Sequence, residues 1–122
     1  MYAGKGVIVT TDSAVFTEIT GLNAPEHSPE DSARPNISVM WRDEDVIVIR
    51  LAFRAGQTMP DHRAGKPIVV LGQTGRIDFT VADSRIVLEP GSAVHVDAKV
   101  THSLHAATDA VATLMVLEAS RS

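Results

Sequence analysis

The chain contains no cysteine and no long apolar run. Without cysteine it can form neither disulfides nor thiolates, which excludes a disulfide scaffold and thiol chemistry. Its longest apolar stretches fall far short of a bilayer span, and the apolar patch near the N-terminus is too short for the core of a signal peptide. These absences predict a cytoplasmic protein that does not bind a membrane.

Clustered basic residues are also missing. The 122 residues include 11 Lys and Arg against 15 Asp and Glu, and the net charge is -4 with both signs mixed along the chain. Binding to nucleic acid needs Lys and Arg gathered on one face to neutralise phosphates, so we expect no nucleic-acid partner. The chain also lacks a Gly-x-Ser-x-Gly elbow, a phosphate-binding glycine loop and a dinucleotide fingerprint, which excludes the enzyme classes built on those motifs.

Short β-type segments separated by turn residues fill the chain. No segment keeps an apolar period of 3.6 residues, so the pattern predicts an all-β sandwich or barrel. The length suits one hydrophobic core, and residues 1–122 are predicted to form a single domain. Strands are predicted at 6–10, 14–19, 38–41, 45–53, 67–71, 76–81, 84–88, 93–96, 102–106 and 110–117.

The segment 21–35 is polar and contains three prolines, which predicts a long loop. Two structures are open for this loop. It could be disordered, or it could fold over the mouth of a barrel.

The segment GQTMPDHRAGKPIVVLGQTG, residues 56–75, resembles the first motif of the cupin family. That motif has a glycine, five residues, His-x-His, three or four residues, a glutamate, six residues and a glycine. Gly56, His62, Ala64, Ile68 and Gly75 stand at its fixed positions. Of the three metal ligands that the family places here, only the histidine at position 62 is present.

The segment GSAVHVDAKVTHSLHA, residues 91–106, resembles the second cupin motif. The family pattern is a glycine, five residues, Pro-x-Gly, two residues, a histidine, three residues and an asparagine. Gly91 and His102 match it, whereas Asp97, Lys99 and Ala106 replace the proline, the second glycine and the asparagine. The combined register of the two motifs identifies the chain as a small stand-alone cupin with a degenerate first motif.

The resemblance implies a cupin-type double-stranded β-helix, a jelly-roll barrel. Its core is expected over about residues 45–118, and residues 1–44 are expected to add N-terminal strands and the polar loop. It also implies a divalent metal, Zn, Fe, Mn or Ni, which His62 and His102 alone would hold weakly. Zinc normally takes three or four protein ligands, and non-haem iron takes two histidines and a carboxylate. Asp97 is the candidate for the missing third ligand.

Strand alternation predicts which side chains meet inside the barrel, because successive residues point to opposite faces. If His102 faces inward, as the resemblance implies, His105 faces outward. On the strand 93–96, His95 points to the opposite face from Val94. The expected interior is mostly apolar with two histidines in it. The predicted ligand-binding residues are His62, His102, Met59, Val70 and Leu104.

Three functions stay open from these residues. The first is binding of a small molecule in the apolar barrel, with His62 and His102 as polar anchors. The second is a cupin enzyme of oxygenase, isomerase or cyclase type, using a metal on the two histidines plus a third ligand, or a metal-free histidine as general base. The third is an inert structural protein that only dimerises.

Residues 68–71, Ile-Val-Val-Leu, are apolar on both strand faces. Such a run is expected only where a strand is covered on both sides. One small barrel cannot cover its own outer face, so the sequence predicts a homodimer.

Overall fold

The computed structural model describes residues 6–11 and 14–118 of the chain. Every regular element in this part is a β-strand, which confirms the all-β prediction, and no helix here is long and apolar enough to cross a bilayer. The strands are β1 (Gly6–Thr11), β2 (Ala14–Ile19), β3 (Asn36–Arg42), β4 (Val46–Phe53), β5 (Thr58–His62), β6 (Ile68–Thr74), β7 (Ile77–Val81), β8 (Ser84–Leu88), β9 (Ala93–Val96), β10 (His102–Ala106) and β11 (Ala110–Leu117).

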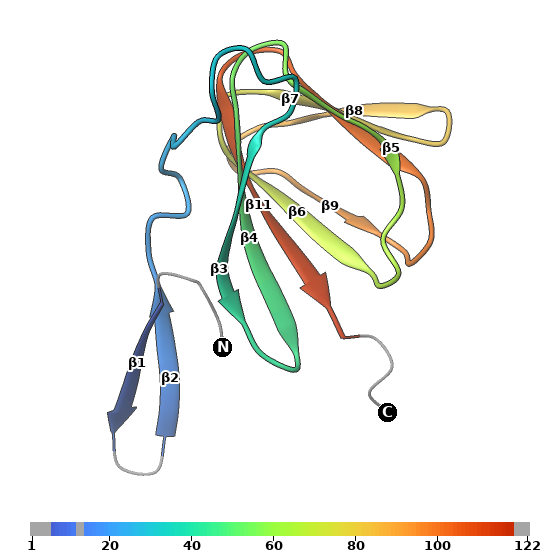
Figure 1. Ribbon diagram of the computed structural model, residues 1–122. Helices are drawn as coiled ribbons and strands as arrows, with labels where there is room; N and C mark the ends of the chain where they lie inside the picture. Colours follow the sequence, from blue (N-terminus) through green and yellow to red (C-terminus); the bar gives the residue numbers. More distant parts are fainter. Residues whose placement is uncertain (1–5, 12–13, 119–122) are drawn as a thin grey trace.

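Strands β3 to β11 form the barrel (Figure 1). One sheet has the order β3-β4-β11-β6-β9 and the other β5-β10-β7-β8, and all the strand pairings are antiparallel. Inward-facing apolar side chains from both sheets make one core, so the expected double-stranded β-helix is confirmed. The buried core consists of Leu51, Phe53, Ile68, Val70, Ile77, Phe79, Leu88, Val96, Leu104, Ala106, Ala110 and Ala112.

The prediction missed strand β5, because Pro60 in its middle argues against a strand. Proline is tolerated on an edge strand, and β5 is one, since among the described residues it pairs only with β10. His62 pairs with His102 and Met59 with Leu104, so three steps on β5 oppose two on β10. This β-bulge lets Met59 and His62 both face the interior, although regular alternation would put them on opposite faces.

The glycines of the two motifs occupy left-handed backbone positions. The φ angles are 88° at Gly56, 67° at Gly75 and 91° at Gly91. At Gly75 an added Cβ would also overlap the carbonyl oxygen of Asp109. Glycine alone adopts this conformation without steric cost, so the turns of the barrel explain why both motifs begin with glycine and why the first also ends with it.

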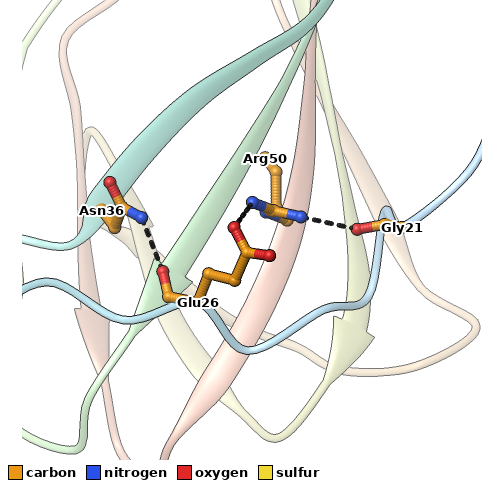
Figure 2. Close-up of polar contacts among 4 residues, drawn as sticks. All are labelled: Gly21, Glu26, Asn36 and Arg50. Atoms are coloured by element: carbon orange, nitrogen blue, oxygen red, sulfur yellow. Dashed lines mark hydrogen bonds and ion pairs between the residues drawn. The ribbon is translucent and has the colours of Figure 1, made fainter. Parts of the chain in front are cut away.

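The loop 21–35 is held against the outer face of the barrel by Arg50 of β4. The Arg50 side chain is only 1% exposed; it donates a hydrogen bond of 2.9 Å to the Gly21 carbonyl and forms an ion pair of 2.7 Å with Glu26 (Figure 2). Asn36 of β3 donates a further hydrogen bond of 2.6 Å to the Glu26 carbonyl. Further along the loop, Arg54 and Gln57 of the β4–β5 turn donate hydrogen bonds of 2.9 Å to the carbonyl and the hydroxyl of Ser28. No residue of the loop lines the barrel cavity described below.

Candidate functional site

A cavity of about 140 Å³ lies between the two sheets, and we call it the barrel cavity. Its lining combines strands from both sheets with one residue of the β5–β6 turn, and all but two of the side chains are apolar. The lining residues are Leu51, Met59, His62, Ala64, Ile68, Val70, His102, Leu104, Leu114 and Val116. The structure therefore brings together all five predicted ligand-binding residues.

The four positions where the cupin motifs place metal ligands all line the barrel cavity. His62, Ala64, Ile68 and His102 all line it, although they come from β5, a turn, β6 and β10. Such convergence requires the register proposed from the sequence, because a shift by one residue would turn each strand position to the outer face.

His62 and His102 stand directly opposite each other on β5 and β10. Their ring centroids are 4.3 Å apart and the ring planes meet at 64°, an edge-to-face arrangement. Phe79 of β7 stacks on the other side of His102, with centroids 5.5 Å apart and planes inclined by 6°. Phe79 was not predicted as a site residue. Its place beside His102 depends on the pairing of β7 with β10, in which Phe79 lies opposite Leu104.

Backbone carbonyls fix the tautomer of both imidazoles. The Nδ1 atom of His62 lies 2.8 Å from the carbonyl oxygen of Pro60, and that of His102 lies 3.0 Å from the carbonyl oxygen of Val100. A carbonyl oxygen can only accept, so Nδ1 carries the hydrogen in each ring. In the neutral form Nε2 then holds a lone pair, and none of the described residues donates a hydrogen bond to it.

His102 is 3% exposed. Burial lowers its pKa below the ordinary value of 6.5; the hydrogen bond to the Val100 carbonyl opposes this shift, and the nearby His62 lowers the pKa further. His102 is therefore neutral at pH 7. Its Nε2 can accept a hydrogen bond from a bound molecule, but a lowered pKa makes it a weak general base.

Asp97 does not join the histidines. Its side chain is 85% exposed, and its Oδ1 atom lies 3.9 Å from Nδ1 of His95 rather than beside His62 or His102. The strand end at Val96 turns Asp97 into solvent, so the structure does not place the predicted third ligand at the pair. His95 and His105 also lie outside the barrel cavity, and His105 faces outward as predicted, with Nδ1 2.9 Å from the Thr58 hydroxyl.

The donor set does not fit the metal site that the family resemblance implies. Two imidazoles are the only nitrogen or oxygen ligands among the lining side chains, and Ala64 and Ile68 offer none. Among the described residues no group of three His, Cys, Asp or Glu lies close enough to hold a metal ion. The Nδ1–H···O=C geometry that orients metal-binding histidines is kept, whereas the rest of the ligand set is replaced by carbon.

The turn before His102 contains a strained residue. Lys99 stands where the second cupin motif has its glycine, and its φ is 67°. This turn connects β9 to β10, and the Lys99 N–H donates a hydrogen bond of 2.7 Å to the Ala64 carbonyl. A residue with a side chain costs free energy in this conformation, so the position still has the geometry that selects glycine.

The family model described as the cupin domain matches residues 50–118. No curated protein matches the chain. Among solved structures, an RmlC-like cupin from Desulfovibrio desulfuricans has a TM-score of 0.68 at 19% identity, covering 82% of this chain and 97% of its own. An RmlC-like cupin from Shewanella frigidimarina has a TM-score of 0.67 at 15% identity, covering 80% and 87%. KdgF from Halomonas has a TM-score of 0.65 at 14% identity, covering 76% and 88%. At these identities the likeness concerns the fold.

The strain at Lys99 predicts that Lys99→Gly stabilises the protein. Relief of the left-handed strain outweighs the extra flexibility of glycine in the unfolded chain, giving a gain of about 0.5–1 kcal/mol. Chemical denaturation measures this change. Lys99→Ala is the matched control and should give no gain, because alanine keeps the strain; equal stability of all three proteins would contradict the motif register.

The lowered pKa of His102 predicts a pH dependence of stability. The unfolded chain takes up a proton at His102 more readily than the folded one, so this contribution is complete above about pH 6.5 and is lost as the pH falls through the folded pKa. Unfolding free energy measured between pH 7 and pH 5 should fall less steeply in His102→Leu. Equal slopes in the natural protein and in His102→Leu would contradict the buried neutral imidazole.

Proposed function

Since the chain belongs to the cupin family, we propose that it uses the barrel as a binding module: a small, mainly apolar molecule occupies the barrel cavity, with His62 and His102 as its polar anchors. The observation that carries this proposal is the cavity itself, in which eight of the ten lining side chains are apolar and the two polar ones stand side by side. Apolar walls with a few converging polar groups are typical of ligand pockets.

The metal-dependent enzyme is the weaker candidate. It needs at least one more ligand beside the two imidazoles, and the family's positions for such ligands hold Ala64 and Ile68. The metal-free general base is weakened in turn by the lowered pKa of His102. Binding of a small molecule needs no further ligand, because it uses the Nε2 atoms of the two imidazoles as hydrogen-bond acceptors.

The partner that we propose is a second copy of the chain. The hairpin β1–β2 projects away from the barrel, and within the described chain its strands pair only with each other (Figure 1). Val15 and Phe16 on it are 72% and 49% exposed. A single two-stranded hairpin is marginally stable in water, so an apolar one of this kind needs a covering surface.

The hairpin borders an apolar groove on the same chain. This groove of about 420 Å³ runs between β2 and the β3–β4 sheet edge and is lined largely by apolar side chains, among them Val15, Phe16, Trp41 and Val48. The exposed Val15 and Phe16 and the rest of this groove form one apolar patch, and two copies related by a two-fold axis can pack these patches against each other.

The cytoplasmic location stays a prediction from the sequence.

The binding proposal predicts that toluene, used as an apolar probe, raises the thermal midpoint by mass action, by an amount that grows with its concentration. Ala64→Leu fills the barrel cavity and should abolish the shift. Ala93→Leu makes the same change at an exposed position outside the cavity and should preserve it. A chelator should leave the midpoint unchanged. Equal toluene shifts in both variants would contradict binding in the cavity.

The dimer proposal predicts that the double variant Val15→Ser/Phe16→Ser is a monomer, because it removes the exposed apolar side chains of the hairpin. Light scattering after size exclusion measures the mass of each species. The control Ile86→Ser/Val87→Ser changes two other exposed apolar residues, 40% and 47% exposed on β8, and should remain dimeric. A natural protein that is already monomeric, or a hairpin variant that stays dimeric, would overturn the proposal.

A further inference from the structure

The barrel cavity offers hydrogen-bond acceptors but no side-chain donor. Both Nδ1–H groups are taken by the carbonyls of Pro60 and Val100, so each neutral imidazole presents only the lone pair of Nε2. Every other lining side chain is aliphatic or, in Met59, a thioether. A ligand that is to satisfy this site must therefore bring the hydrogen itself.

The volume limits the ligand to about one ring. The barrel cavity measures about 140 Å³. An apolar cavity of about 150 Å³ is large enough to hold benzene, so a single ring with one small substituent is the size that fits.

The surroundings also select a neutral molecule. No Lys or Arg lines the barrel cavity, His102 is 3% exposed, and the Nδ1–H groups of both imidazoles are taken by backbone carbonyls. A carboxylate entering here would lose its hydration and find neither a cation nor an N–H donor. A hydroxyl or amino group keeps a hydrogen bond, because it can donate to Nε2.

On the basis of the proposed binding function, we infer that the ligand is a neutral compound about the size of one aromatic ring, which donates a hydroxyl or amino hydrogen to Nε2 of His62 or His102. The paired imidazoles then act as the element that distinguishes this ligand from an apolar molecule of the same shape. A molecule without a donor hydrogen leaves the buried Nε2 acceptor unpaired, whereas a hydroxyl or amino group satisfies it.

Three probes of similar size separate the effects of ligand shape, of a hydrogen-bond donor and of charge on the affinity. Toluene has the shape without a donor, phenol has the shape with a neutral donor, and benzoate carries a negative charge. Calorimetric titration of the full chain at neutral pH should show phenol binding at least as tightly as toluene, and benzoate binding about 10-fold or more weakly than phenol.

The variants His62→Leu and His102→Leu test the role of the acceptors. Phenol affinity should fall by about 10-fold or more in at least one of them, while toluene affinity changes by less than about 3-fold. Toluene binding in the same variant shows that the cavity is intact. The two histidines lie on different strands, so if one variant fails to fold, the other still tests the role of the acceptors.

The outcomes separate this inference from the proposed function. If neither toluene nor phenol binds the natural protein, the proposed function is wrong and the inference falls with it. If toluene binds and phenol binds more weakly, or phenol is insensitive to both variants, the binding function stands and the inference is wrong. Preferred binding of benzoate would also overturn the inference, because it would show that the imidazole pair acts as a cation.

Discussion

The cross-strand pairing of His62 with His102 is the interaction on which the site depends. It exists because a β-bulge in edge strand β5 resets the register, and the bulge coincides with Pro60, which has no N–H to lose from the sheet. The carbonyls of Pro60 and Val100 then fix both rings through Nδ1. The result is a pair of imidazoles at the wall of an apolar cavity whose Nδ1–H groups are both occupied, and both the proposed ligand and its hydrogen bonding follow from this arrangement.

The other two ligand positions of the family explain why this cavity is apolar. Ala64 and Ile68 occupy them, and Ile68 is 3% exposed within the core. A glutamate at position 68 with no metal to pair with would bury an uncompensated charge, at a cost of several kcal/mol. An isoleucine there adds burial instead, so the barrel keeps its geometry while the interior changes from a coordination site to a hydrophobic pocket.

The fold was predictable from the sequence because strand alternation and the spacing of the motif glycines are local signals. Every predicted strand is present, whereas β5 was missed, since a proline argues against a strand and only the sheet reveals that this one lies at an edge. His62, His102 and Val70 were placed correctly in the interior. Asp97 was not, because the direction of a side chain at a strand end depends on the turn that follows. The carbonyl partners of the two imidazoles depend on backbone geometry that no residue type encodes, so only the structure shows which nitrogen faces a ligand.

We propose that this barrel keeps the histidine geometry of a cupin metal site but holds an organic ligand instead of a metal. Elemental analysis of untagged protein purified without chelator tests it most directly, beside His62→Ala/His102→Ala and beside Ala64→His/Ile68→Glu, which restores the missing ligands. We expect no stoichiometric metal in the natural protein or the first variant, and bound metal in the second. Near-stoichiometric metal in the natural protein that disappears from the first variant would contradict it.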